Sequence, residues 1–310
     1  MSMAQAMFAK AVLLLAAQIL PIVIPFGKPR VNEQPRAPIA TAGPQWAAAC
    51  KDNDGWDSPA PPVRIHGNAY YVGTCGIAAI LISDRAGHVL IDGGTEQGAD
   101  LIADNIRRLG FNIRDVKYLL HSHEHFDHVG GTSKLQRLSG AMLVASAPAA
   151  RVFATGAAGA GDPQAGMHKP FAAATVGRIV GDGDEVRLGE MMLTALATPG
   201  HTPGALSWRW VSCDGGVCRT IVYADSLSPV SRDDYRFSDH AAYLAAYRAS
   251  IAKVADSRCE ILVTPHPSAS GLRERLARGE TLLDENACRD YAAKLTANLD
   301  ARLAKENAGK

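Results

Sequence analysis

Four histidines and two acidic residues crowd into eight consecutive positions of this 310-residue chain. The stretch from His121 to His128 reads HSHEHFDH, and it directly follows the apolar, strand-like run 116–120. Crowded imidazoles are costly unless something compensates them, and neutral imidazole together with ionised carboxylate is a donor set that suits Zn²⁺. The sequence therefore predicts a metal site at the end of a strand.

The spacing within this stretch divides its side chains between two metal ions. In an extended loop, residues two apart point the same way, so His123, His125 and Asp127 would share one side and His128 would point to the other. His123 and His125 would then serve one ion, while Asp127 and His128 would serve its neighbour. Two ligands per ion are too few for zinc, so the chain must supply further ligands from elsewhere.

Two more histidines stand at turns that follow predicted strands. His201 lies in the turn PGHTPG, and His266 lies in PHP after the short apolar run 260–264. With them each ion would have three protein ligands and one position left for water, which is typical of catalytic zinc. His121 and Asp92 are interpreted as orienting partners of these ligands. The other histidines are interpreted as ordinary surface or core residues, namely His66, His88, His168 and His240.

Alternating strand and helix patterns run through the chain and predict sheets covered by helices. The long Gly- and Ala-rich segment 154–166 predicts a flexible loop, in which Gln164 could contact a substrate. Two similar strand-rich halves are expected, with a break near residue 190. The predicted strands are 70–84, 88–92, 116–120, 141–145, 185–188, 191–196, 208–213, 218–223 and 260–264, and the predicted helices are 96–109, 132–138, 239–255 and 283–307.

The N-terminus and the cysteines indicate an exported protein. A basic start followed by the uncharged apolar run 11–26 is typical of a secretory signal, and the Pro-rich segment 27–44 reads as a disordered leader. Six cysteines allow fifteen pairings, and disulfides are the default outside the cytosol. A hairpin would place Cys213 opposite Cys218. The charge balance of 32 basic against 31 acidic residues gives no footprint for nucleic acid.

The motif HxHxDH, residues 123–128, resembles the signature of the metallo-β-lactamase superfamily. From about Trp46 onward the chain resembles the class B, subclass 3 β-lactamases. The matching segments are IDGG at 91–94, HSHEHFDH at 121–128, PGHTPG at 199–204, YADSLS at 223–228 and TPHP at 264–267. The resemblance implies an α/β fold, an αβ/βα sandwich of two packed sheets with helices on the outer faces. It also implies a single domain of two αβ halves over residues 43–310, after the leader that the N-terminal sequence predicts over 1–42, and two Zn²⁺ ions per chain.

The resemblance implies which residues do the chemistry. The first zinc would be bound by His123, His125 and His201, and the second by Asp127, His128 and His266. A zinc-bound hydroxide would hydrolyse the β-lactam amide bond of penicillins, cephalosporins or carbapenems, with Asp127 as the catalytic residue that orients the nucleophile. Ser226 and Ser228 would bind the substrate carboxylate. The disulfides would join Cys50 to Cys75, Cys213 to Cys218 and Cys259 to Cys288.

Other functions remain open at this point. If Asp225 bridged both metals, as an aspartate does in thiolester hydrolases of the glyoxalase-II type, thiolester or phosphodiester hydrolysis would gain ground; lactone hydrolysis is a further option. A non-catalytic zinc protein is disfavoured, because structural zinc sites prefer closed, cysteine-rich spheres. We expect a periplasmic or secreted monomer whose partner is a small β-lactam, without nucleic acid and without stable membrane association once the signal is removed.

Overall fold

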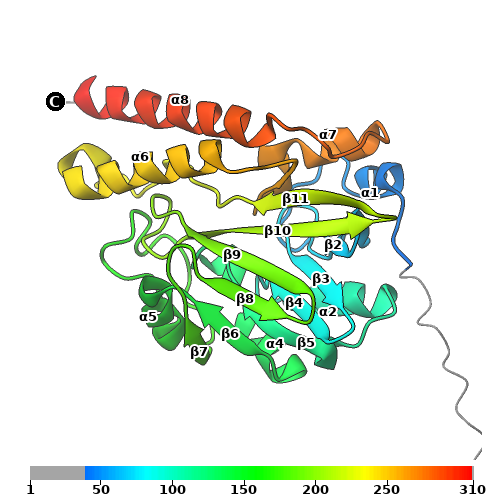
Figure 1. Cartoon of the computed structure of the whole chain (residues 1–310). Coiled ribbons are helices and arrows are strands. Elements are labelled where there is room, and N and C mark those ends of the chain that lie inside the picture. Colours follow the sequence, from blue (N-terminus) through cyan, green and yellow to red (C-terminus); the bar gives the residue numbers. More distant parts are fainter. Residues whose placement is uncertain (1–38, 309–310) are drawn as a thin grey trace, which may run out of the picture. The chain divides into compact units, whose positions relative to one another are not determined.

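The polypeptide forms two facing β-sheets with helices on both outer sides (Figure 1). The structure is a computed structural model, and it describes residues 39–308. Within these residues the first sheet has seven strands in the order β1-β2-β3-β4-β5-β6-β7, and the second has five in the order β12-β11-β10-β9-β8. This is the αβ/βα sandwich that the sequence analysis predicted.

The strands of the first sheet are β1 (Val63–His66), β2 (Ala69–Tyr71), β3 (Ile80–Asp84), β4 (Gly87–Ile91), β5 (Val116–Leu120), β6 (Met142–Ala145) and β7 (Val176–Ile179). Those of the second are β8 (Glu185–Leu188), β9 (Met191–Ala197), β10 (Leu206–Asp214), β11 (Val217–Tyr223) and β12 (Ile261–Val263). The α-helices are α1 (Gly43–Ala49), α2 (Gly98–Arg108), α3 (Phe126–Val129), α4 (Thr132–Ser139), α5 (Ala147–Thr155), α6 (Ala241–Asp256), α7 (Leu272–Ala277) and α8 (Ala287–Ala308). Three short 3₁₀ turns are η1 (Ile113–Asp115), η2 (Phe237–Asp239) and η3 (Pro267–Ser270).

The main core lies between the two sheets. Side chains alternate along each strand, so Ile80 and Ile82 of β3 face the second sheet while Leu81 faces the helices of the first. Leu206 and Trp208 of β10 meet them from the other side. Both faces of the first sheet are therefore apolar and buried, which explains the nearly continuous hydrophobic runs of its central strands.

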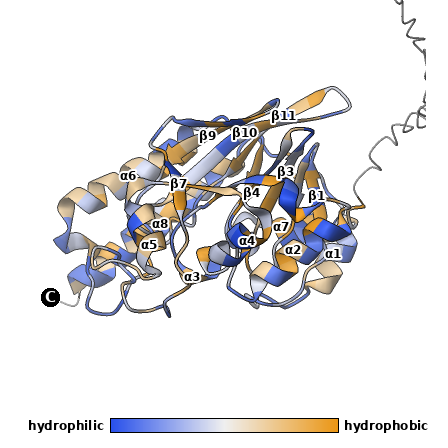
Figure 2. Ribbon diagram, turned by 90° about the horizontal axis from the view of Figure 1, so that it is seen from below, coloured by the Kyte–Doolittle hydropathy of each residue, from blue (hydrophilic) through white to orange (hydrophobic). Residues whose placement is uncertain are grey.

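The helices bury one face each against the sheets. Ile102 and Ile106 of α2 pack on the outer side of the first sheet. Tyr291, Leu295 and Leu299 of α8, spaced four residues apart, pack with α6 on the second sheet. Figure 2 shows the outer helices with hydrophilic and hydrophobic segments in alternation, as expected for amphipathic helices that cover a sheet. Among the described residues, none of the helices is long and apolar enough to cross a membrane.

The strand directions bring several strand ends to one edge of the sandwich. Strands β4 to β7 run parallel in the first sheet, and β11 and β12 run parallel in the second. Strand β9 has the same direction as β11, because β10 pairs antiparallel with both. The chain leaves β4, β5, β9, β11 and β12 immediately before the polar segments singled out in the sequence. The strand order and directions therefore bring these polar segments together at one edge of the sandwich.

Several predicted boundaries shift. The strand predicted over 70–84 is two strands, β2 and β3, because Tyr71 O–H donates to the Ile77 carbonyl and holds the chain between them in a turn. The chain changes sheets between Ile179 and Glu185, earlier than the expected break near residue 190. The strands at 116–120, 185–188 and 191–196 and the helix at 132–138 are confirmed within a residue.

Most of the predicted leader lies outside the described residues. Its last positions already belong to the fold, since Thr41 bridges to Val63 and its N–H donates to the Pro62 carbonyl at 2.8 Å. The prediction of a disordered segment up to residue 44 is wrong for these positions. The backbone pairing there satisfies groups that a disordered leader would leave to water.

Three disulfides join Cys50 to Cys75, Cys213 to Cys218 and Cys259 to Cys288. This is the pairing that the resemblance implied. Cys213 and Cys218 face each other across the β10–β11 register, as the hairpin argument expected.

Candidate functional site

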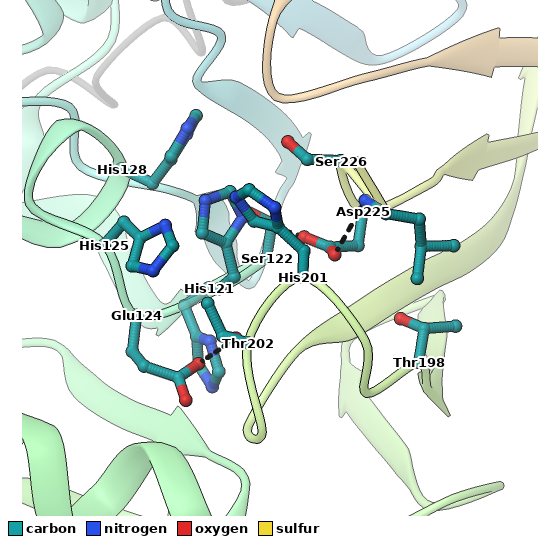
Figure 3. Close-up of polar contacts among 12 residues, drawn as sticks. His121, Ser122, Glu124, His125, His128, Thr198, His201, Thr202, Asp225 and Ser226 are labelled. Atoms are coloured by element: carbon teal, nitrogen blue, oxygen red, sulfur yellow. Dashed lines mark hydrogen bonds and ion pairs between the residues drawn. The ribbon is translucent and has the colours of Figure 1, made fainter. Parts of the chain in front are cut away.

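Three of the predicted ligands of the first metal lie together at the common edge of the sheets. His123 and His125 follow β5, and His201 follows β9. Their ring centroids are 4.6 to 5.0 Å apart, and one nitrogen of each ring lies within 4.8 Å of the others. All three side chains are buried, and Figure 3 shows His125 and His201 turned toward the same space.

A second group adjoins the first. His128 Nε2 lies 3.0 Å from Asp127 Oδ2 and 3.3 Å from His266 Nε2, and His266 Nε2 lies 3.5 Å from the same carboxylate oxygen. His123 is close enough to group with Asp127 and His128 as well. The six side chains thus form two adjoining triads.

The local backbone differs from the expected extended loop. Residues Phe126–Val129 form the single helical turn α3, in which the N–H groups of His128 and Val129 both donate to the His125 carbonyl. The prediction that His123, His125 and Asp127 share one side of an extended chain is therefore wrong. Asp127 and His128 diverge because successive helical residues are rotated by about 100°.

Each histidine of the first triad uses one ring nitrogen on the protein. His123 Nδ1 donates to Asp225 Oδ1 at 2.7 Å, His125 Nε2 donates to Asp162 Oδ2 at 3.1 Å, and His201 Nδ1 donates to the Ser228 carbonyl at 2.9 Å.

The other nitrogen of each ring is the candidate ligand atom, and that of His201, Nε2, lies 3.4 Å from the Gln164 amide nitrogen. His123 Nε2 is buried and has no hydrogen-bond partner among the described residues. A buried polar atom without a partner costs free energy, and a metal ion would remove that cost. The donor set fits a zinc site, since ligating histidines usually hold a hydrogen-bond acceptor on the far nitrogen.

The electrostatics favour the protonation states that a metal needs. Burial, reinforced by the neighbouring histidines, holds the pKa of His123 and of His201 well below the usual value. Burial also lowers the pKa of His266 to about 4. These imidazoles are therefore neutral at physiological pH, as metal ligation requires.

Asp127 and His128 lie close enough to form an ion pair, with 3.0 Å between Oδ2 and Nε2. Burial works against the charge of Asp127, but the adjacent His128 outweighs it and the pKa of the carboxyl falls below its usual range. Burial likewise opposes the charge of His128, yet Asp127 and Asp92 raise the pKa of its ring to about 10. A metal bound here must displace that proton, so binding releases it.

Asp92 supports the cluster from β4. Its carboxylate accepts from the Ser122 N–H at 2.6 Å, from Ser122 Oγ at 2.7 Å and from Tyr223 O–H at 2.7 Å, and it lies 3.6 Å from His128 Nδ1. This places Asp92 behind a predicted ligand, where the sequence analysis expected it.

His121 lies elsewhere. Its Nε2 accepts from the Ser146 N–H at 3.3 Å, and its ring packs on Phe153. Figure 3 shows the ring pointing away from His125 and His128. Among residues 39–308 this ring has no hydrogen bond to a candidate ligand, so its orienting role stays a prediction. Instead the His121 carbonyl accepts from Trp208 Nε1 at 2.8 Å, which ties the two sheets together.

The predicted substrate-binding residues line the same region. Ser226 Oγ is buried and has no partner within the described residues, whereas Ser228 Oγ lies 3.1 Å from His201 Nδ1. The Gln164 amide nitrogen lies 3.4 Å from His201 Nε2, and its oxygen accepts from His168 Nε2 at 3.1 Å. His168, interpreted from the sequence as an ordinary residue, thus lies beside the cluster, with its ring 4.8 Å from that of His125.

Two acidic residues that sequence reasoning left out belong to the site. Glu124 accepts from Thr202 Oγ1 at 2.7 Å and from the Gly204 N–H at 2.8 Å, and Asp162 accepts from His125. Glu124 stands inside the histidine motif, and Asp162 is the one acid in the Gly- and Ala-rich segment 154–166. These two positions were the only sign in the sequence that the carboxylates belong to the site.

Asp225 is fully buried, and its carboxylate contacts the outward nitrogen of His123 rather than the space that the ligand nitrogens share. Its second oxygen accepts from the Leu227 N–H at 3.3 Å. Burial raises the pKa of this carboxyl well above its usual value. Its position is that of an orienting partner and not of a bridge.

Comparison with known proteins identifies the family. Residues 72–266 match the model of the metallo-β-lactamase superfamily. Among solved structures, the chain is 58% identical to the MIM-2 metallo-β-lactamase, with a TM-score of 0.83 over 86% of this chain and 99% of that one. It is 43% identical to MEM-A1, a subclass B3 metallo-β-lactamase from a soil metagenome library, with a TM-score of 0.80 over 83% and 100%.

A curated relative, a hydroxyacylglutathione hydrolase of Bradyrhizobium sp. (strain ORS 278), is 30% identical over 132 residues. That match covers 41% of this chain and less than half, 44%, of the relative. The family match and the donor geometry together indicate a metal-dependent hydrolase. This chain belongs to the metallo-β-lactamase superfamily, and the solved structures that it resembles include members of subclass B3.

Proposed function

We propose that this protein hydrolyses the amide bond of β-lactam antibiotics with two bound Zn²⁺ ions. The observation that carries the proposal is the pair of adjoining triads, five histidines and Asp127, buried at one edge of the sandwich. The likeness to solved metallo-β-lactamases over most of the chain supports the same substrate class.

Zinc, when bound, activates water at neutral pH and polarises the scissile carbonyl. The chain supplies the positioning. His123, His125 and His201 would hold one ion, and Asp127, His128 and His266 the other. Asp127, ionised and next to both triads, accepts a hydrogen bond from the attacking water and orients it toward the carbonyl carbon.

Substrate binding falls to side chains around the cluster. Ser226 Oγ has an unused hydrogen-bonding capacity, and Ser228 Oγ lies beside His201, so their hydroxyls donate to the carboxylate of the substrate. Gln164 is held between His201 and His168, from where its amide reaches a substrate lying over the first triad. Penicillins, cephalosporins and carbapenems all offer such a carboxylate beside the lactam.

Thiolester hydrolysis is the second candidate, and the match to a hydroxyacylglutathione hydrolase favours it. Its requirement is a carboxylate that bridges the metals. The 2.7 Å contact between Asp225 and the outward nitrogen of His123 speaks against a bridge. We therefore rank β-lactam hydrolysis first.

We further propose export to the periplasm or the medium, directed by an N-terminal leader that ends before Thr41, where the chain pairs with β1. Three disulfides support an oxidising compartment. We propose a monomer whose partner is the small-molecule substrate.

The test is nitrocefin hydrolysis by the purified protein, before and after removal of metal with a chelator. We expect turnover that is lost with the metal and restored by about two equivalents of zinc. A protein that binds two zinc ions and turns over a glutathione thiolester or a lactone, but no β-lactam, would contradict the proposal.

A further inference from the structure

Asp162 links the segment after α5 to the first triad. Its side chain is almost fully buried, with 2% of the residue exposed. Oδ2 accepts from His125 Nε2 at 3.1 Å, while Oδ1 accepts from the Gln164 N–H at 2.7 Å. Oδ1 also lies 3.4 Å from His125 Nε2, so the carboxylate joins its own segment to the histidine cluster.

The position of Asp162 is fixed from a third direction. The Arg232 guanidinium donates to the Asp162 carbonyl at 3.0 Å, and the Arg232 N–H donates to the Pro163 carbonyl at 3.0 Å. Arg232 is itself paired with Asp234 at 2.8 Å. Although glycines and alanines surround it, Asp162 is thus clamped, which the prediction of a flexible loop did not anticipate.

We propose that Asp162 is a positioning residue that fixes the tautomer of His125, so that Nε2 carries the proton and Nδ1 is presented to the metal. An ionised carboxylate accepts hydrogen bonds and cannot donate, so the nitrogen facing it must carry the proton. A neutral imidazole has one N–H and one acceptor nitrogen, so fixing the first also fixes the second. The inference rests on the metal site of the proposed function.

A merely structural role for Asp162 predicts something different. If the carboxylate only capped the turn through the Gln164 N–H, an asparagine would replace it, because its amide oxygen accepts the same bond. Asparagine differs on the His125 side. The Gln164 N–H holds the amide oxygen of this asparagine, so its NH₂ group faces Nε2 of His125. Nε2 must then accept a hydrogen bond, and the ring proton moves to Nδ1.

The decisive experiment compares Asp162→Asn with the wild type by metal titration and by ¹⁵N NMR of the zinc-loaded protein labelled at histidine. We expect Asp162→Asn to weaken binding of one metal ion by about 10- to 100-fold. The unfolding midpoint of the metal-free protein should stay within the range of a control. That control is Asp184→Asn, whose carboxylate accepts from the Gly181 N–H at 2.7 Å and has no hydrogen bond to the histidine cluster among the described residues.

The wild-type spectrum gives a test that needs no variant. In the zinc-loaded protein, His125 should show a proton on Nε2 and the metal-bound chemical shift on Nδ1. Metal on Nε2 of His125, or an unchanged affinity for both metals in a folded Asp162→Asn protein, would overturn the proposal. Neither result depends on β-lactam turnover, so a failure of the proposed function is recognised separately by nitrocefin hydrolysis of the wild type.

Discussion

At the scale of single residues, the two nitrogens of each imidazole in the first triad have different roles. In the first triad one nitrogen of every ring is hydrogen-bonded to the protein, by Asp225, Asp162 or the Ser228 carbonyl, which leaves the other as the candidate ligand atom. Such partners fix ring orientation before the metal arrives. The candidate ligands are therefore preorganised, and the carboxylates that accept their hydrogen bonds contribute to metal affinity together with the ligands themselves.

Asp225→Asn tests the role of the acid behind His123. Because Asp225 contacts the outward nitrogen of this ligand, we expect the variant to bind two zinc ions at saturating zinc, with an affinity for one of them that is roughly 10-fold or more weaker. Equilibrium dialysis followed by metal analysis measures both quantities. If the variant held only one zinc at any concentration, Asp225 would be a bridging ligand and thiolester hydrolysis would become the better proposal.

At the scale of elements, Glu124 fastens together the two segments that carry the first triad. It lies between His123 and His125, and it accepts from Thr202 and Gly204 on either side of the turn that follows His201. Burial raises the pKa of its carboxyl, and the two hydrogen bonds act in the opposite direction because they stabilise the charged form. A Cβ at Gly204 would lie 2.6 Å from Glu124 Oε1, so this approach requires a glycine.

Thr202→Val removes one donor to this buried carboxylate and keeps the side-chain shape. We expect the free energy of unfolding to fall by about 1–3 kcal/mol, because one oxygen of Glu124 is left without a partner. Thr202→Ser retains the hydroxyl and serves as the control, with a smaller loss. Chemical denaturation of both variants checks this, and equal losses would show that the hydroxyl is not what stabilises the segment.

At the scale of the whole molecule, the site belongs to neither sheet alone. The first sheet supplies His123, His125, Asp127 and His128, and the segments after β9 and β12 of the second supply His201 and His266. The apolar interface between the sheets holds these contributions in place. A change that loosens the packing of the second half should therefore displace His201 and His266 and weaken metal binding.

Removal of the Cys259–Cys288 disulfide tests how much this cross-link stabilises the second half of the fold. The bond joins the segment before β12, which leads to His266, to the start of α8, and it spans 29 residues. We expect Cys259→Ala/Cys288→Ala to lose about 2–4 kcal/mol of unfolding free energy, because a long loop is no longer constrained in the unfolded chain.

The pair Cys213→Ala/Cys218→Ala is the matched control. Its bond spans only five residues in a hairpin whose register is already set by β10 and β11, so its loss should cost less. Denaturant unfolding under non-reducing conditions compares the two double variants. A larger loss from the hairpin pair would contradict the argument from loop length.

Much of this protein followed from the sequence alone. The types and spacing of His123, His125, Asp127 and His128 indicate a metal site, because few other arrangements reconcile so many imidazoles and a carboxylate in six residues. Period-two and helical patterns predicted most strands and helices, since local burial alternates with the geometry of each element. Boundaries failed where a side chain intervened, as Tyr71 does between β2 and β3.

Only the tertiary structure decided which groups surround the ligands. No local signal separates Asp162, Glu124 and His168 from ordinary loop residues. The contacts that bring Asp162 and Glu124 into the site join positions at least 37 residues apart, and His168 contacts Gln164 through the bend of its own loop. The same holds for His121, whose place in the histidine-rich stretch suggested a role that its ring does not take. Sequence spacing predicts the candidate ligands, whereas the packing of the two sheets decides which nitrogen of each ring is hydrogen-bonded to the protein.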